Sequence, residues 1–267
     1  GEGVGRLAWR VATDRRALVE KHMALVMGGD ADAVALGKQM FASYGRYWAE
    51  VFWVRPRRKA QIVAGCRVLN EEIVQEAKAT GRGVVLALPH MGNWESAGAK
   101  AEEIGIPVLA AAEGLSNKKI VDWFVEVRAA LGIETVITGR GHRVTAMLAQ
   151  RLKEGGVIAL VADRDVTGRG VDVEFFGETT KMPPGPVALA DRTGAVLLPV
   201  ACYFVPGGGH RFVVSPPLEI PDIENRDERI QAGTQAFASV LEGLIREAPQ
   251  DWHLFVPNWP SDREGEE

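Results

Sequence analysis

The sequence predicts an α/β fold: a mainly parallel central sheet flanked by helices on both faces, with an N-terminal helical pair. From residue 60 onward, short apolar runs typical of buried strands alternate with longer runs typical of helices. Such alternation usually forms a parallel sheet that helices cover on both faces. Several helical runs also end at a glycine, as helices commonly do; these glycines are Gly81, Gly105, Gly132, Gly155 and Gly194.

The first 59 residues are typical of two helices. Residues 5–27 carry many cations, and the segment Gly28-Gly29-Asp30 is expected to end that helix. Residues 31–54 form a second, aromatic-rich helix, which the basic segment 55–59 follows. Aromatic residues beside cations favour contact with an anionic membrane, so we expect residues 1–59 to govern membrane contact and to take no part in the chemistry. The alternative is that the aromatic residues pack on the domain and the cations are solvated.

Residues 60–260 are expected to form one α/β domain, and the acidic residues 261–267 a frayed tail. A loop at 206–209 joins the last two strands and predicts an antiparallel hairpin. The strand-like runs are 62–69, 83–88, 107–111, 135–138, 157–162, 171–176, 195–205 and 211–215. The helical runs are 71–79, 94–104, 118–131, 143–154, 187–192 and 226–247.

Composition narrows the class of function. The chain has 267 residues, of which 46% are apolar, and its net charge of −4 argues against nucleic acid as the main partner. Its two cysteines, Cys66 and Cys202, lie far apart and have neither a disulfide nor a metal-site spacing. No apolar run reaches the roughly 18 residues that a membrane-spanning helix needs. We therefore expect no metal site and a reduced, cytoplasmic setting.

A histidine and a glutamate follow one predicted strand at its carboxyl end. The apolar run 84–88 precedes His90, and Glu95 opens the next helical run. Ligands of open α/β sheets bind beyond the carboxyl ends of strands, where a base held by a carboxylate can take a proton from a hydroxyl. Backbone N–H groups at Gly92 and Asn93 could stabilise an oxyanion. The structural alternative is a turn at Gly92, a helix cap at Asn93 and a first-turn carboxylate at Glu95.

These residues resemble a known superfamily. The spacing of His90 and Glu95 is the HxxxxD/E signature of the lysophospholipid acyltransferase-like superfamily. The segment HMGNWE at 90–95 resembles the HxGNW(D/E) form found in the bacterial lipid A and phosphatidylinositol mannoside acyltransferase branch. Later blocks follow in the same order over about residues 44–259, with the mannoside enzymes most similar; these blocks are Asp163-Arg164-Asp165, 174–178, 182–186 and Asp251-Trp252-His253.

The resemblance implies a membrane-associated acyltransferase in which His90 deprotonates a glycolipid hydroxyl that attacks an acyl thioester. Glu95 would orient His90. The implied donor is acyl-CoA as a co-substrate, with no other cofactor and no metal, and the implied acceptor is phosphatidylinositol mannoside. The protein would sit peripherally at the cytoplasmic face of the cell membrane, with an apolar groove for the acyl chain beside His90. The implied substrate-binding residues are Arg128, Asp163, Arg164 and Glu174, of which the two arginines would meet phosphates.

Alternatives remain at this point. Arg128 could be a solvated helix arginine paired to Glu126 or Glu134, and residues 163–165 could be a structural ion-pair cluster. Asp163 also stands where the mannoside enzymes carry a glutamate. A lipid A-type acyltransferase that uses acyl carrier protein is the nearest alternative function, and a catalytically inactive lipid-binding protein is another. An esterase is disfavoured, because the segment around Ser96 lacks the first glycine of the GxSxG motif.

Overall fold

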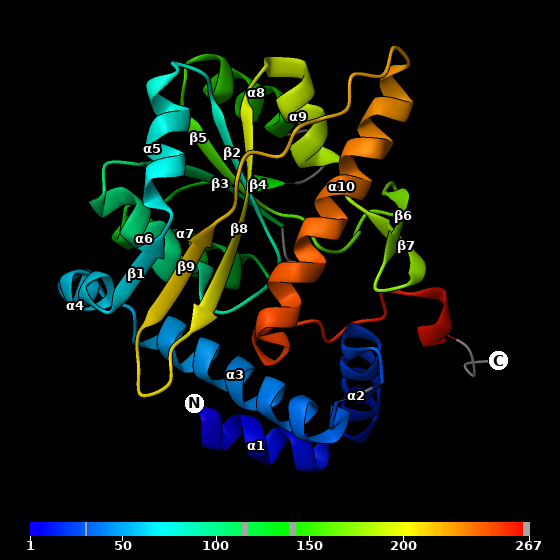
Figure 1. Ribbon diagram of the computed structural model, residues 1–267. Coiled ribbons are helices and arrows are strands. Elements are labelled where there is room, and N and C mark those ends of the chain that lie inside the picture. Colours follow the sequence, from blue (N-terminus) through cyan, green and yellow to red (C-terminus); the bar gives the residue numbers. More distant parts are fainter. Residues whose placement is uncertain (30, 114–116, 139–142, 264–267) are drawn as a thin grey trace.

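The computed structural model describes residues 1–29, 31–113, 117–138 and 143–263 (Figure 1). Asp30 of the expected helix stop and residues 264–267 of the expected tail lie outside the described residues. Seven strands form the central sheet in the order β1-β9-β8-β2-β5-β3-β4. Their bounds are β1 (Cys66–Leu69), β2 (Val84–Leu88), β3 (Val108–Glu113), β4 (Glu134–Thr138), β5 (Val157–Val161), β8 (Val196–Phe204) and β9 (His210–Val214).

The sheet is mainly parallel, which confirms the predicted fold class. Strand β2 pairs in parallel with β5 and β8, and β3 pairs in parallel with β4 and β5. Strand β9 returns antiparallel to β8, which confirms the hairpin predicted at 206–209. Strand β1 pairs in parallel with β9 at the edge of the sheet.

Helices cover both faces of the sheet (Figure 1). Val85 and Ala87 of β2 pack with side chains of α8, α9 and α10, whereas the alternate residues Val84 and Leu88 pack on the α5 and α6 side. The longer helices are α1 (Glu2–Val11), α2 (Thr13–Met27), α3 (Ala33–Trp53), α5 (Glu71–Ala79), α6 (Trp94–Glu103), α7 (Lys118–Leu131), α8 (Val144–Lys153), α9 (Gly185–Thr193) and α10 (Arg226–Glu247). The shorter ones are α4 (Lys59–Ala64), η1 (Pro56–Arg58), η2 (Pro249–Asp251) and η3 (Pro260–Arg263).

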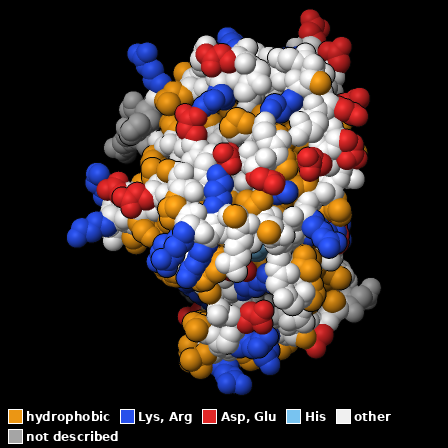
Figure 2. Space-filling view, turned by 90° about the vertical axis from the view of Figure 1, so that its left-hand side faces the viewer, with side chains coloured by type: hydrophobic (Ala, Val, Ile, Leu, Met, Phe, Trp, Pro, Cys, Tyr) orange, Lys and Arg blue, Asp and Glu red, His pale blue; other side chains and the backbone are white. Residues whose placement is uncertain are grey.

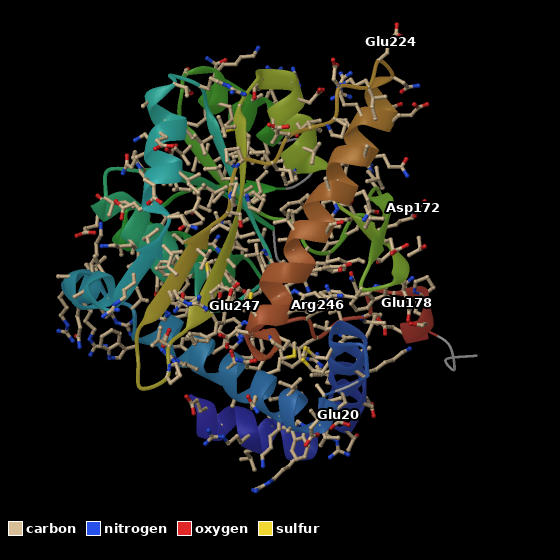
Figure 3. All side chains as sticks on the ribbon, viewed as in Figure 1. Glu20, Asp172, Glu178, Glu224, Arg246 and Glu247 are labelled. Carbon is tan, nitrogen blue, oxygen red and sulfur yellow. The ribbon has the colours of Figure 1, made fainter. Side chains whose placement is uncertain are left out.

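Two expectations about elements were wrong, and one predicted strand lies outside the central sheet. The helix expected over 5–27 is two helices, α1 and α2, because the backbone leaves the helical conformation at Ala12. The strand expected over 62–69 begins only at Cys66, since α4 takes its first part. The strand expected over 171–176 is present as β6 (Val171–Phe175), which pairs with β7 (Glu178–Met182) in a separate two-stranded sheet. Figure 3 shows Asp172 and Glu178 of this hairpin on the side of α10 away from the central sheet.

The N-terminal helices lie at the carboxyl edge of the sheet. In Figure 1, α3 passes beneath the end of β8, and α1 lies on the outer side of α3. The crossing of α1 and α3 is close, because a Cβ at Gly5 would lie 2.0 Å from the carbonyl oxygen of Phe41. Only glycine fits there. Helix α3 thereby reaches the edge at which ligands of α/β sheets bind.

Candidate active site

His90 follows β2 at the carboxyl edge of the sheet and is held by a carboxylate. Its Nδ1 lies 2.6 Å from Oδ1 of Asp163, and its backbone N–H donates to Oδ2 of the same carboxylate at 3.1 Å. The side chain is partly exposed, and its ring meets the ring of Trp94 edge to face. Because Asp163 engages Nδ1, Nε2 is left as the nitrogen that can act on a substrate.

Asp163 is a buried carboxylate whose oxygens are well satisfied. It lies two residues after the end of β5, the parallel neighbour of β2, and the register that pairs Leu88 with Val161 brings it opposite His90. Trp252 donates its indole N–H to Oδ2 at 2.7 Å. Burial alone raises the pKa of a carboxyl group, but the charge of His90 and the hydrogen bonds from His90 and Trp252 lower the pKa of Asp163 to about 2. Asp163 therefore contacts His90 and Trp252, a geometry suited to orienting His90, and the substrate-binding role expected for it stays a prediction.

Glu95 is not the partner of His90, which corrects the expectation from the motif spacing. Its buried carboxylate accepts from Nε of Arg128 at 2.9 Å and from Nη2 at 2.8 Å. Burial lowers the pKa of Arg128, but the charge and hydrogen bonds of Glu95 outweigh it and raise that pKa. The reason is geometric: α6 begins at Trp94, so Glu95 in its first turn points toward α7. Arg128 is thus ion-paired, but it is largely buried and its partner is Glu95, whereas the structural alternative had a solvated arginine paired to Glu126 or Glu134.

The turn after His90 uses Gly92 and Asn93 mainly for structure. The N–H of Gly92 donates to the carbonyl of Asp251 at 2.8 Å, so it cannot serve as the expected oxyanion donor without breaking that bond. Gly92 has a φ of 58°, and a Cβ there would lie 2.3 Å from the carbonyl oxygen of Cys202. Asn93 accepts from the N–H of Ser96 at 3.2 Å and so caps α6. No acceptor for the backbone N–H groups of Trp94 and Glu95 is found in the described part of the chain.

Residues 163–165 have three separate roles. Arg164 makes no hydrogen bond or ion pair with any described residue, and its Nε is buried without a partner. Asp165 accepts from the N–H groups of Thr167 and Gly170 and so holds its own loop. Burial raises the pKa of Asp165, but these hydrogen bonds lower it overall. Arg164 is therefore the residue of this block that is left to bind a ligand.

Glu174 lies apart from this group. Its side chain is exposed on the hairpin of β6 and β7, and its backbone exchanges two hydrogen bonds with the side chain of Gln235 on α10. None of its hydrogen bonds reaches a residue beside His90. The hairpin position therefore gives no support to the substrate-binding role expected for Glu174.

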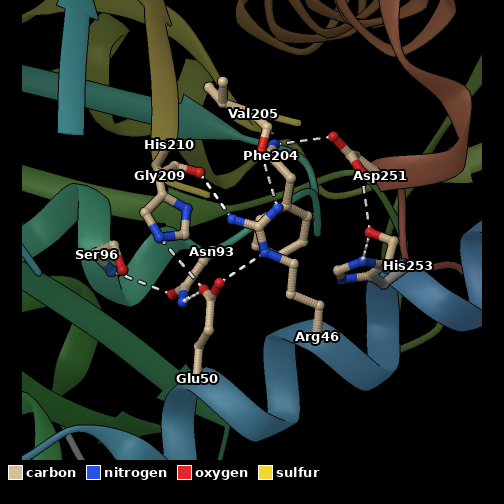
Figure 4. Close-up of polar contacts among 11 residues, drawn as sticks. Arg46, Glu50, Asn93, Ser96, Phe204, Val205, Gly209, His210, Asp251 and His253 are labelled. Carbon is tan, nitrogen blue, oxygen red and sulfur yellow. Dashed lines mark hydrogen bonds and ion pairs between the residues drawn. The ribbon is translucent and has the colours of Figure 1, made fainter. Parts of the chain in front are cut away.

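The segment Asp251-Trp252-His253 completes the site, although sequence reasoning gave it no role. Met91 and Trp252 form an antiparallel bridge, and the N–H of His253 donates to the carbonyl of His90 at 2.7 Å. Asp251 accepts from the N–H of Phe204 at 2.9 Å (Figure 4). The resemblance of this segment to the mannoside enzymes was a signal, but nothing in the sequence showed that it lies beside His90.

An apolar cavity of about 110 Å³ lies between α6 and the sheet. Its lining includes Trp94, whose ring contacts that of His90, and side chains of β1 and β9. Among the described residues that line it, only Glu95 and Arg128 are charged. The cavity is lined by Val68, Val74, Leu86, Leu88, Trp94, Glu95, Ala97, Gly98, Ala101, Ile104, Ile106, Val108, Ala110, Ala111, Arg128, Ile133, Ala159, Val161, Val200, Cys202, Phe212 and Val214.

None of the helices in the described ranges has the length and apolar character needed to cross a bilayer.

Comparison with known proteins agrees with the site. The family model described as bacterial lipid A biosynthesis acyltransferase matches residues 1–261. A phosphatidylinositol mannoside acyltransferase of Mycolicibacterium smegmatis is 36% identical over 247 residues, covering 91% of this chain and 79% of the relative. An enzyme of the same name from Mycobacterium tuberculosis is 38% identical over 254 residues, covering 91% and 77%. A lipid A biosynthesis acyltransferase of Haemophilus influenzae is 21% identical over 232 residues, covering 86% and 70%. The chain is an acyltransferase and belongs to the bacterial lipid A biosynthesis acyltransferase family.

Proposed function

We propose that this acyltransferase moves a fatty acyl group from acyl-CoA to a hydroxyl of a glycolipid, specifically a phosphatidylinositol mannoside. The observation that carries the proposal is the pair of His90 and Asp163, next to Trp94, whose ring contacts His90 and lines an apolar cavity. A hydroxyl acceptor needs a base, and a fatty acyl donor needs an apolar space. The names of the relatives at 36% and 38% identity favour the mannoside acceptor.

In the proposed reaction, Nε2 of His90 takes the proton of the acceptor hydroxyl while its oxygen attacks the thioester carbonyl carbon. Asp163 stabilises the imidazolium and fixes the tautomer through Nδ1. The tetrahedral intermediate places negative charge on the former carbonyl oxygen, and the first-turn N–H groups of α6 at Trp94 and Glu95 are the proposed donors to it. The intermediate collapses by breaking the C–S bond, and the leaving thiolate takes the proton back from His90.

Arg164 is the proposed phosphate ligand. It follows Asp163 immediately, and it carries a guanidinium with no carboxylate partner among the described residues. A guanidinium can bind phosphate oxygens through two parallel hydrogen bonds. Both CoA and a phosphatidylinositol headgroup carry phosphate. Arg128 is a weaker candidate, because its Nε and Nη2 already bind Glu95.

The cavity beneath α6 is the proposed site of the acyl chain. Each methylene that leaves water there contributes about 0.8 kcal/mol. At about 110 Å³, the cavity is smaller than the engineered cavity of about 150 Å³ that binds benzene in another protein. A long chain therefore requires α6 and the sheet to move apart as it enters.

Peripheral association with the cytoplasmic face of the cell membrane is proposed from the surface of the N-terminal helices. Val4, Leu7 and Val11 form one stripe of α1, and they are 71%, 58% and 73% exposed. Phe52 and Trp53 are exposed at the end of α3, just before the basic segment 55–59. Figure 2 shows hydrophobic side chains beside Lys and Arg at the lower end of the molecule. An apolar stripe flanked by cations fits an anionic lipid surface.

The aromatic residues expected to face that surface divide into two groups. Phe41 and Tyr47 are buried, and Tyr44 and Trp48 are half-buried in an aromatic cluster that reaches Phe124 of α7. These four aromatic residues pack within the protein, as expected if the aromatic residues pack on the domain rather than face a membrane. Among these aromatic residues of α3, only Phe52 and Trp53 are exposed at the surface where a membrane interface could reach them.

A direct assay tests the proposal. The purified protein is given [14C]palmitoyl-CoA with phosphatidylinositol mannoside, and the products are separated and identified by mass spectrometry. We expect one additional acyl chain on the acceptor, and a loss of about 10²–10⁴ in rate for His90→Ala, the range for removal of a general base. A parallel reaction with palmitoyl-acyl carrier protein and lipid A precursor tests the alternative that the Haemophilus influenzae relative favours. Binding of acyl-CoA without turnover under any condition would instead support an inactive lipid-binding protein.

A further inference from the structure

Glu50 joins the N-terminal helix α3 to the turn that follows His90. Its Oε2 accepts from Nδ2 of Asn93 at 2.7 Å, and its Oε1 accepts from Nε of Arg46 at 2.7 Å (Figure 4). Nε2 of His210, at the start of β9, lies 3.3 Å from the same Oε2. The carboxylate of Glu50, on α3, therefore contacts both the turn before α6 and the hairpin of β8 and β9.

Asn93 is held at both ends of its amide. Its Oδ1 caps α6 by accepting from the N–H of Ser96, while its Nδ2 donates to Glu50. The side chain is buried, so losing either partner leaves a polar group that water cannot readily satisfy. The cap and the bond to Glu50 together fix where α6 begins, four residues after His90.

Glu50 is in turn fixed by Arg46. The remaining guanidinium nitrogens of Arg46 donate to the carbonyls of Val205 at 3.1 Å and Gly209 at 2.9 Å. The guanidinium also stacks over the ring of Phe204, 4.2 Å from its centroid. Arg46 thus anchors Glu50 to the hairpin, which leaves its carboxylate little freedom to move relative to the sheet.

We propose that Glu50 is a positioning residue for acyl transfer, acting through Asn93 on the start of α6. The first-turn N–H groups of α6 and the ring of Trp94 against His90 both depend on where that helix begins. Residues 1–59 would then contribute to the chemistry, contrary to the role in membrane contact alone that their composition favours. This inference rests on the proposed function, because its measure is the rate of acyl transfer.

A donor–acceptor swap tests the proposal. Glu50→Gln turns one carboxylate oxygen into an NH2 group, so the side chain can accept from Asn93 or from Arg46 but not from both. Asn93→Asp keeps an oxygen that can cap α6 but places a second carboxylate against Glu50. Combining Glu50→Gln with Asn93→Asp restores a donor opposite an acceptor. The control is Glu20→Gln on α2, whose carboxylate also pairs with an arginine four residues earlier and is 25% exposed, compared with 26% for Glu50.

Each single variant is expected to lower kcat about 10- to 100-fold, the scale of a displacement of about 1 Å at a reacting group. KM for palmitoyl-CoA should change less than about threefold, since no substrate contact is lost. The double variant should regain most of kcat, and Glu20→Gln should retain it. Thermal unfolding of all four variants separates loss of folding from loss of positioning, and if Glu50→Gln fails to fold, the comparison of Asn93→Asp with the double variant carries the test.

Two results would overturn the inference. One is wild-type kcat in a folded single variant, and the other is a double variant that folds yet stays as slow as Asn93→Asp alone. Failure of the proposed function looks different, because the wild-type protein would then show no acyl transfer at all.

Discussion

Trp252 donates its indole N–H to Oδ2 of Asp163 across 2.7 Å, so the carboxylate that holds His90 is itself held by a residue from the end of the chain. Three donors therefore meet one buried carboxylate: Nδ1 and the backbone N–H of His90, and Nε1 of Trp252. A buried charge that is bonded in this way has a fixed orientation and favours a charged partner. That orientation fixes the direction in which Nε2 of His90 points.

We expect Trp252→Phe to lower kcat about tenfold, the scale of a lost hydrogen bond to a charged group. The substitution keeps an aromatic ring in the core but removes the N–H, so Asp163 gains rotational freedom and its pKa rises. Trp259→Phe is the matched control, because Trp259 is also buried and donates its indole N–H, at 3.0 Å, to the carbonyl of Phe175. Steady-state kinetics and thermal unfolding of both variants check this. Equal losses of kcat would mean that Trp252 acts only by packing.

We expect Asp163→Asn to lower kcat more than Glu95→Gln does. An amide at position 163 no longer stabilises the imidazolium and can favour the wrong tautomer, which costs about 10²–10⁴ in rate in comparable sites. Glu95→Gln leaves Arg128 without its charge partner beside the cavity, so it should reduce stability and donor binding first. Acyl-transfer kinetics with both substrates varied separates the two effects. A larger loss of kcat in Glu95→Gln than in Asp163→Asn would instead make Glu95 the residue that supports His90.

The sequence predicts His90 at the end of a strand, as the structure has it, but it pairs His90 with Glu95 rather than with Asp163. His90 and Asp163 each follow a strand-like run, and both were recognised as strand-end residues. Their contact depends on β2 and β5 being neighbours in register, which no local pattern reveals because strand order is a long-range property. The spacing of His90 and Glu95 was visible, but the direction of Glu95 depends on the positive φ of Gly92 and on the cap at Asn93.

In the N-terminal region too, only part of the structure could be predicted from the sequence. Its helical character was predictable from its pattern, but the break at Ala12 and the close crossing at Gly5 were not, because tertiary packing decides them. Aromatic content alone did not distinguish the buried Phe41 from the exposed Phe52. The exposed apolar stripe of α1 became visible only once the face of α1 that packs on α3 was known.

Burial of His253 should make stability depend on pH. Burial, together with the charge of His90, lowers the pKa of His253 to about 3. The unfolded chain takes up this proton near pH 6.5 and the folded chain only near pH 3, so the free energy of unfolding falls as pH drops between these values, by up to about 1.4 kcal/mol per unit. Nε2 of His253 bonds Oγ of Ser43 at 2.9 Å, and His253→Gln can keep that bond without titrating. Urea unfolding at several pH values should therefore give a shallower slope for the variant, and identical slopes would exclude His253 as the cause.

Filling the cavity should shorten the preferred acyl chain. Ala159 of β5 lines the cavity, and Ala159→Leu adds three carbons that a fatty chain would otherwise displace. We expect kcat/KM for palmitoyl-CoA to fall about tenfold or more while octanoyl-CoA is affected less, because about 0.8 kcal/mol is lost for each methylene left in water. Ala60→Leu, on the exposed surface of α4, is the control. A uniform loss across chain lengths would place the acyl chain elsewhere.

Removing the apolar stripe of α1 should weaken membrane binding without changing the chemistry. Leu7→Ser combined with Val11→Ser deletes two exposed apolar side chains that would otherwise leave water at the bilayer surface. We expect binding to vesicles of phosphatidylcholine with phosphatidylinositol to weaken by about 1–3 kcal/mol. The loss should persist at high salt, because salt screens charges rather than apolar contacts.

Met147→Ser on α8, a side chain that is 50% exposed, is the control for loss of an apolar group elsewhere. Co-sedimentation at two salt concentrations measures binding, and an assay in detergent, where no bilayer is needed, should show unchanged turnover. If the double variant instead binds vesicles like the wild type and loses activity in detergent, then α1 supports the fold of the site and the membrane contact lies on another face.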